Sequence, residues 1–180
     1  MDELVFQAMA RWPDVPAMFG WLRLDRRGNW FLVERGRPNF DEAIHGLGSP
    51  ITSPPILDFI GRNYQADPAG RWYWQNGPQC VYVDLDLAPL ILRVFGSGSA
   101  AQLVSHTGFR IESIEAVYAG PAGELWVNSG LGPGVVHDLD LGQLELEFEE
   151  VVSAVWLQGR RHPVAALATG CLAHFEQRPR

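Results

Sequence analysis

The 180-residue sequence contains no lysine, so all 14 of its basic residues are arginine. This absence excludes Schiff-base chemistry, a Walker-type lysine and a side-chain amine nucleophile from any site that the chain forms alone. Cysteine is scarce too: Cys80 and Cys171 lie far apart, without the close spacing of a zinc or redox motif. We therefore expect two reduced thiols, as in a bacterial cytoplasm, rather than a disulfide.

The sequence also lacks basic clusters and long hydrophobic runs. Residues 1–71 carry 8 arginines against 9 acids, residues 72–180 carry 6 against 12, and the net charge is −7. An acidic chain without a basic cluster is a poor match for nucleic acid or for an anionic membrane surface. The N-terminus lacks the apolar stretch that a secretory signal contains, and no apolar run approaches the roughly 20 residues of a membrane span. We expect a cytoplasmic protein with neither a nucleic-acid nor a membrane partner.

The alternation of apolar and polar residues predicts a strand-rich α+β fold. Short helices are expected over residues 3–11, over residues 53–63 and from Pro163 onward. The expected strands are residues 19–25, 29–34, 71–75, 79–87, 90–95, 111–119, 124–128, 135–141 and 143–149. Short connections favour antiparallel meander sheets over a doubly wound parallel sheet, and the length fits a single globular domain over residues 1–180.

Two strand-rich segments, residues 64–90 and 117–144, resemble each other. Both contain the letters PAG, a nearby tryptophan, an asparagine, a loop rich in glycine and proline, and then DLDL. A single inserted residue aligns them, which suggests a duplicated meander in two similar halves. Chance similarity between turn-rich strands is the alternative interpretation.

Aromatic residues are concentrated in the first of these segments, in the stretch RWYWQNG at residues 71–77. Its Asn-Gly pair predicts a tight reversal, with a loop of either two or four residues. Either loop puts Trp72 and Trp74 on the same face as Val81 and Val83, because a shift of two residues preserves the side of a strand. We predict a buried core face rather than an exposed aromatic binding surface.

Paired aspartates are the main candidates for chemistry. Asp84 and Asp86 form one Asp-Leu-Asp pair, and Asp138 and Asp140 form another. On a strand both carboxylates of a pair point the same way, about 6–7 Å apart, so they could hold Mg²⁺ or Ca²⁺ or act as acid and base. The alternative is the solvated face of an amphipathic strand. His137 lies on the apolar side of the strand expected over residues 135–141, which also holds Asp138 and Asp140. It is either a core residue or a functional histidine near these acids.

These patterns indicate a binding or accessory domain without evident catalysis, whose ligand is a small molecule or a protein. The alternative is a metal-dependent, hydrolase-type enzyme that uses the aspartate pairs with His137. The two hypotheses differ in where they place these residues. An enzyme would gather both aspartate pairs and His137 in one cleft, whereas a binding domain would leave them spread over solvated sheet faces. No cofactor is expected, and the sequence predicts neither whether the chain is an enzyme nor its oligomeric state.

The stretches RWPDVPAMFGWLRLDRRGNWFL and FIGRNYQADPAGRWYWQNGPQCVYVDL resemble an uncharacterised family of proteobacterial proteins, grouped as a domain of unknown function. The resemblance covers the N-terminal half best. That family has no assigned activity or catalytic residues, so the resemblance implies a cytoplasmic bacterial protein and gives no role to any residue.

Overall fold

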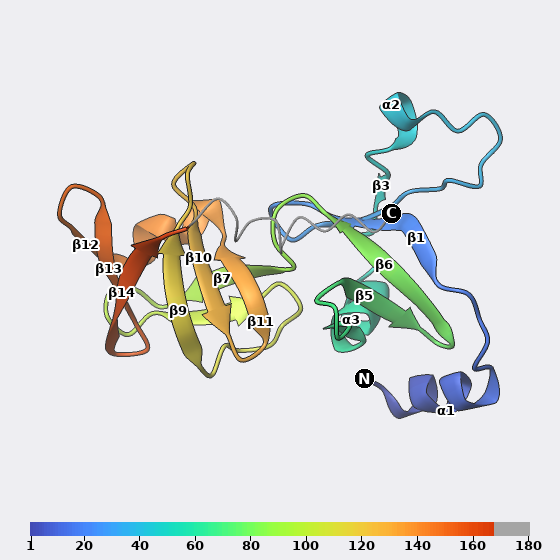
Figure 1. Ribbon diagram of the computed structural model, residues 1–180, viewed down its shortest axis with the longest axis horizontal. Helices are drawn as coiled ribbons and strands as arrows, with labels where there is room; N and C mark the ends of the chain where they lie inside the picture. The colour runs from blue at the N-terminus through green and yellow to red at the C-terminus, as the bar shows by residue number, and fades with distance from the viewer. Residues whose placement is uncertain (168–180) are drawn as a thin grey trace. The chain divides into compact units, whose positions relative to one another are not determined.

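The computed structural model describes residues 1–167, which form two compact units (Figure 1). The first unit ends at Asp86 and the second begins at Leu87. Each unit contains one sheet and a hydrophobic core of its own. No helix within residues 1–167 is long and apolar enough to cross a membrane.

The first unit consists of a six-stranded sheet and three helices. Its strands are β1 (Met18–Leu24), β2 (Trp30–Leu32), β3 (Ser49–Pro50), β4 (Tyr64–Ala66), β5 (Trp72–Asn76) and β6 (Gln79–Leu85). Their order across the sheet is β3-β2-β1-β6-β5-β4. The helices are α1 (Glu3–Arg11), α2 (Glu42–His45) and α3 (Pro54–Arg62), so the predicted N-terminal and middle helices are confirmed. Proline suits the start of α3, where the N–H that it lacks would have no partner in the helix.

The core of the first unit joins α3 to the central strands of its sheet. Ile60 of α3 is buried together with Leu22 and Leu24 of β1. Residues two apart on a strand share a face, so Arg23, between these leucines, lies on the opposite face. The first sheet therefore has one apolar face toward α3 and one polar face.

The aromatic hairpin is part of this core. Trp74 on β5 pairs directly with Val81 on β6; Val81 is buried in the core cluster, and the half-buried Trp74 packs against that cluster. Trp72 is half-buried and lies against Tyr64 of β4, with 4.8 Å between the ring centroids. The register confirms that the two tryptophans share a face with Val81 and Val83, but both tryptophans are half-buried and so lie nearer to the surface than predicted.

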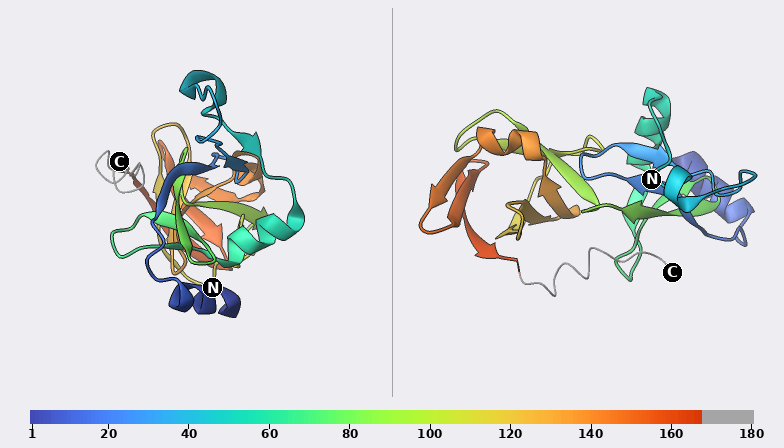
Figure 2. Two further views of the ribbon diagram at one scale, coloured as in Figure 1. Left: turned by 90° about the vertical axis from the view of Figure 1, so that its right-hand side faces the viewer. Right: turned by 90° about the horizontal axis from the view of Figure 1, so that it is seen from above.

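The second unit contains an eight-stranded sheet that curls into a half-barrel (Figure 2). Its strands are β7 (Leu90–Phe95), β8 (Gln102–Ser105), β9 (Ile114–Ala119), β10 (Leu125–Ser129), β11 (Gly132–Val136), β12 (Glu145–Phe148), β13 (Val152–Leu157) and β14 (Arg160–Ala166). Their order is β12-β13-β14-β9-β10-β11-β7-β8. Ile91, Trp126 and Val135 are buried in its core, and a short 3₁₀ helix, η1 (Asp138–Gln143), follows β11.

Both sheets are mixed, so the prediction of antiparallel meanders describes only part of the fold. The parallel pairs are β1 with β6, β7 with β11, and β9 with β14. In each pair the two strands are separated by other elements, as parallel strands must be. Alternation within a strand indicates its two faces but not which strand lies beside it, and this is why the prediction missed the parallel pairs.

Two predicted elements are wrong. The strand predicted over residues 135–141 ends at Val136, and the DLDL letters that follow fold as η1. The start of the helix predicted from Pro163 is also wrong, because residues 163–166 belong to the strand β14; the rest of that prediction falls on residues 168–180, which lie outside the described residues. Pro163 lies where β14 passes from pairing with β13 to pairing with β9, so it is not inside a strand that is paired on both sides.

The two sheets share one strand arrangement over five strands, β2-β1-β6-β5-β4 in the first and β8-β7-β11-β10-β9 in the second. In both, the second and third of these strands run parallel and the other neighbours run antiparallel. The turns at Gly70 and Gly123 also match, with φ angles of 81° and 87°. This left-handed backbone conformation favours glycine.

Candidate functional site

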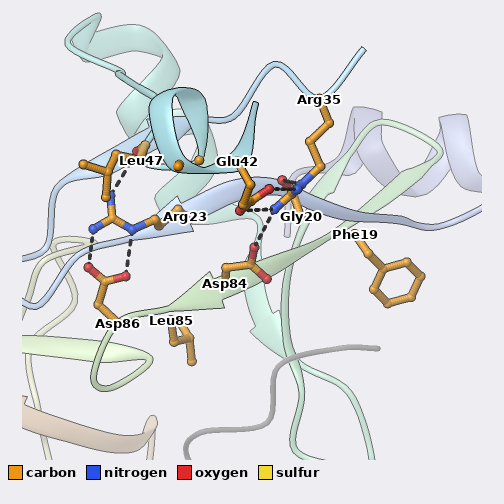
Figure 3. A pocket seen from close by; sticks show the side chains of 11 residues that line it. Phe19, Gly20, Arg23, Arg35, Glu42, Leu47, Asp84, Leu85 and Asp86 are labelled. Carbon is orange, nitrogen blue, oxygen red and sulfur yellow. Dashed lines mark hydrogen bonds and ion pairs between the residues drawn. The ribbon is translucent and has the colours of Figure 1, made fainter. Parts of the chain in front are cut away.

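A pocket of about 710 Å³ opens on the polar face of the first sheet (Figure 3). It lies where β1 and β6 run side by side, and the segment 35–47, which includes α2, completes its wall. The lining residues are Phe19, Gly20, Arg23, Arg35, Glu42, Ala43, Gly46, Leu47, Asp84, Leu85 and Asp86. Two of them are arginines and three are acids, so the site combines charges of both signs.

Arg23 forms one end of the charged lining. Strand alternation points it away from the core, and the parallel register of β1 and β6 places it beside Asp84. Its guanidinium binds both oxygens of Asp86, with 2.7 Å between Nε and Oδ1, and its Nη1 donates to the carbonyl of Leu47 at 3.0 Å. The Arg23 side chain is only 18% exposed, so this bidentate pair is better shielded than a surface ion pair. It ties the end of β6 to the segment that carries α2.

Arg35 forms the other end and holds an irregularity of β1 in place. The strand has a register shift around Gly20, whose φ angle is 74°. The Gly20 carbonyl accepts a hydrogen bond from Nε of Arg35, and a Cβ at this position would overlap the arginine side chain. The left-handed conformation favours glycine here, and any larger residue would also displace the Arg35 side chain. Arg35 also donates to both oxygens of Glu42 and lies 3.9 Å from Oδ2 of Asp84.

The structure brings Asp84 and Asp86 together in this pocket. Both oxygens of Asp86 accept hydrogen bonds from Arg23, and Asp84 forms an ion pair with Arg35 (Figure 3). Their side chains are about one-third exposed, so a ligand in the pocket can reach both. Sequence reasoning selected these two carboxylates but missed both arginines, because the contact of Arg23 arises from the parallel pairing of β1 with β6 and Arg35 lies outside the strands. Alternation on β1 was the one signal that placed Arg23 on the polar face.

The second aspartate pair does not share one face of a strand, and that prediction is wrong because the segment folds as η1. Asp138 is exposed, whereas Asp140 is buried. His137 is also buried and caps η1: its Nδ1 accepts a hydrogen bond from the N–H of Leu139 at 3.2 Å and lies 3.1 Å from Oδ1 of Asp138. These residues belong to the second unit, whereas Asp84 lies in the first.

Asp140 anchors η1 to β7. One of its oxygens accepts hydrogen bonds from Nε of Arg93 at 2.6 Å and from the N–H of Val94 at 3.1 Å, and the other accepts from Nη2 of Arg93 at 3.1 Å. The Arg93 guanidinium holds the pKa of Asp140 below its ordinary value, against the opposing effect of burial. A carboxylate occupied in this way stabilises the fold and is a poor candidate for a ligand of a metal.

A preformed metal centre is absent from residues 1–167, where no three histidine, cysteine, aspartate or glutamate side chains are arranged to hold an ion. Metal sites built from protein side chains usually draw on at least three such donors.

An aromatic cluster lies beside the pocket on the same polar face. Phe19, which lines the pocket, stacks on Tyr82 with ring centroids 4.7 Å apart and an angle of 3° between the planes. Oδ2 of Asp67 accepts hydrogen bonds from the Tyr82 hydroxyl at 3.0 Å and from Nε of Arg71 at 2.8 Å. Burial, and then the hydrogen bond to Asp67, raises the pKa of Tyr82 to about 12. The neutral phenol therefore supports Phe19 at one side of the pocket.

A protein-family model described as a protein of unknown function (DUF2946) matches residues 1–175. The chain belongs to this family. The match confirms the resemblance to an uncharacterised family that the sequence alone suggested. No curated protein matches this DUF2946 chain.

Two solved structures are similar to this DUF2946 chain. A DUF1285 family protein from Silicibacter pomeroyi DSS-3 is 19% identical, with 96% of this chain and 99% of that chain covered and a TM-score of 0.54. A DUF1285 family protein from Shewanella baltica OS155 is 10% identical, with 68% and 88% covered and a TM-score of 0.47. At 19% identity the first likeness shows a shared fold and carries over no function.

Proposed function

We propose that the chain is a binding domain whose small-molecule ligand occupies the pocket of the first unit, without catalysis. One observation carries the proposal: the pocket is concave, and its two arginines are already held by carboxylates and backbone carbonyls. Charges fixed in advance lose little freedom when a ligand binds, which favours affinity. A few placed polar groups on a partly apolar wall are also the usual form of a ligand site.

The composition of the lining favours binding over catalysis. Among the described residues that line the pocket there is no histidine, cysteine, serine, threonine, tyrosine or lysine. Carboxylates are thus the groups left to act as a base or nucleophile, and both oxygens of Asp86 accept hydrogen bonds from Arg23. The family resemblance and the expectation of reduced thiols support a bacterial cytoplasm as the setting.

A pocket-filling variant tests the proposal. Ala43 lines the pocket from α2 and is exposed, so Ala43→Trp fills the site without disturbing the core. Ala10→Trp is the matched control, because Ala10 is an exposed residue of α1 outside the lining. The assay is a thermal-shift screen of cationic, anionic, zwitterionic and neutral metabolites, since a ligand at 100 times its Kd stabilises the native state by about 2.7 kcal/mol.

We expect some compounds to raise the melting temperature of the wild type and of Ala10→Trp but not of Ala43→Trp. If every class of compound leaves the wild type unchanged, the proposed function is refuted. It is equally refuted if all compounds that bind the wild type also stabilise Ala43→Trp, because the ligand would then bind elsewhere.

A further inference from the structure

We infer that the segment 35–47, which carries α2 and walls one side of the pocket, is a strap that opens and closes over it. The inference goes beyond the proposed function, because it concerns access to the pocket and does not depend on which ligand enters. The strap is joined to the sheet at its two ends, where β2 pairs with β3. Between these ends, charged contacts hold the strap where packing does not.

Burial gives the strap little reason to stay in place. None of residues 34–50 is buried, and α2 adds no residue to a core. Two apolar side chains of the strap, Ile44 and Leu47, are 73% and 67% exposed, and Figure 1 shows the segment as a loop that stands away from the sheet. Gly36 passes close to the ring of Trp21, but this contact lies near one end of the strap. Most helices are held by an apolar face packed on a core, and α2 has none.

Two arginines link the strap to the sheet instead. Nη1 of Arg23, on β1, donates to the carbonyl of Leu47 at 3.0 Å. Arg35 donates from Nε to the carbonyl of Gly20 and from its other two nitrogens to Glu42 of α2 (Figure 3). Arg35 thus connects α2 to β1, and Arg23 connects β1 to the last residue of the strap.

The link through Arg35 is the more sensitive to salt. The Glu42 side chain is 63% exposed and that of Arg35 is 33% exposed, so water and dissolved ions reach the pair. Salt screens such an exposed ion pair, and its contribution is small even at low salt. Arg23 is only 18% exposed, so its contacts are better shielded. We therefore expect the strap to open at α2, where the contact between Arg35 and Glu42 is lost first.

The second unit shows that a sheet of this arrangement does not need the strap. Arg93 on β7 is the counterpart of Arg23, because each follows the residue that pairs with the equivalent valine of the neighbouring parallel strand. Arg93 binds both oxygens of Asp140, as Arg23 binds both oxygens of Asp86. The connection from β8 to β9, residues 106–113, contains no counterpart of α2. The arginine–aspartate pair thus belongs to the shared sheet, and the strap is an addition that can move without disrupting it.

Electron–electron double resonance on the full chain measures the position of the strap. With Cys80→Ser and Cys171→Ser as the background, nitroxide labels are attached at Ile44→Cys on α2 and at Asp58→Cys on α3, which are both exposed positions. At low salt we expect mainly one distance between the labels, from the closed strap. Sodium chloride at about 1 M should add a second, open population, because it screens exposed ion pairs.

Three variants at low salt identify the contacts that hold the strap. Glu42→Gln should raise the ratio of open to closed molecules by about two- to fivefold, the range that an exposed ion pair contributes. Arg35→Gln also loses the link to the carbonyl of Gly20 and should raise the ratio further. Arg37→Gln is the matched control, because Arg37 is an exposed arginine of the same segment outside the pocket lining, and it should leave the distances unchanged.

Each outcome supports or overturns the inference. A broad distribution in the wild type at low salt overturns it, because the strap would then be free. A single distance that persists in high salt and in Glu42→Gln and Arg35→Gln overturns it as well, because other contacts would then hold the strap. So does an equal change in Arg35→Gln and Arg37→Gln, which would point to net charge. Hydrogen exchange of peptides from β1 and β6 must stay unchanged, since lost protection there would mean that the sheet opens with the strap. A failed ligand screen refutes the proposed function and leaves these measurements unaffected.

Discussion

The substitution Asp140→Asn tests how η1 is held in the second unit. The wild-type side chain is 4% exposed and accepts hydrogen bonds from Arg93, from the N–H of Val94 and from the amide of Gln143. Asparagine keeps the shape but replaces one acceptor oxygen with a donor, which then faces other donors. Because Arg93 is 50% exposed and regains water, the loss is smaller than the about 3–5 kcal/mol typical of a broken, fully buried pair. We expect the free energy of unfolding of this unit to fall by about 2–3 kcal/mol.

Urea unfolding measures this loss. With a denaturant slope of about 2 kcal/mol per M, the expected change moves the midpoint by about 1–1.5 M. Hydrogen exchange of peptides from residues 87–144, followed by mass spectrometry, reports the second unit separately from the first. Asp138→Asn is the matched control, since Asp138 is 54% exposed on the same η1, and we expect it to lose less than about 0.5 kcal/mol.

Acid provides a second check on the same residue. The pKa of Asp140 is lowered in the folded state, so its stabilising effect is fully present above about pH 4, the ordinary value for an unfolded aspartate. The effect is lost as the pH falls through the folded pKa, and the difference between wild type and Asp140→Asn must shrink there. Equal midpoints at neutral pH, or a difference that grows in acid, would refute this account of the anchor.

Three further predictions concern the core, the aromatic cluster and the turns. Trp30, which is 4% exposed, should lose about 3–5 kcal/mol of unfolding free energy as Trp30→Ala, measured by urea denaturation. Tyr82 should ionise near pH 12, with its stabilising effect present below about pH 10 and lost as the pH rises toward 12, and NMR titration should show a lower pKa in Asp67→Asn. Gly70→Ala and Gly123→Ala should each lose about 1–2 kcal/mol in urea unfolding, because a Cβ meets nothing within 4 Å in either turn and the strain comes from the backbone alone.

Local patterns in the sequence predicted most strands, but not their partners. The strand at residues 90–95 was predicted with its observed bounds, because an apolar run there lies between turn signals. The segment that forms η1 was predicted as a strand because Asp-Leu-Asp-Leu alternates, but its backbone forms a 3₁₀ helix in which Asp140 is buried. Pairing depends on contacts such as that between Arg23 and Asp86, which are 63 positions apart, and no short-range pattern encodes them.

The sequence predicted only part of the pocket, because it indicates the direction of a side chain on a strand but not which distant residues lie beside it. Asp84 and Asp86 stand out because they are acids on an alternating strand, whose geometry fixes where they point. Arg35 lies in an irregular segment and Glu42 begins the four-residue helix α2, so no periodicity indicates a direction for either side chain. Their roles follow from the register shift of β1 at Gly20, which exposes a carbonyl for Arg35 to bind.

The shared strand arrangement also bears on the origin of the two units, and we propose that they descend from one duplicated unit. Trp74 pairs with Val81 across β5 and β6, as Val127 pairs with Gly134 across β10 and β11, so equivalent residues are 53 positions apart. The same spacing relates the turn glycines, one at Gly70 and the other 53 positions later. A spacing that stays constant through two hairpins supports descent from a common meander more directly than sequence similarity does.

This spacing separates the two aspartate pairs. With the constant spacing of 53 positions, Asp84 corresponds to His137. Asp84 aligns with Asp138 only after one residue is inserted. The insertion falls where β11 has ended and η1 begins, so the second pair follows a backbone that has left the sheet. The same four letters therefore contribute to a charged pocket in one unit and to the anchor of a 3₁₀ helix in the other. Sequence similarity can reflect common descent of the strands, but the chemistry of a carboxylate depends on the backbone conformation of the residue that carries it.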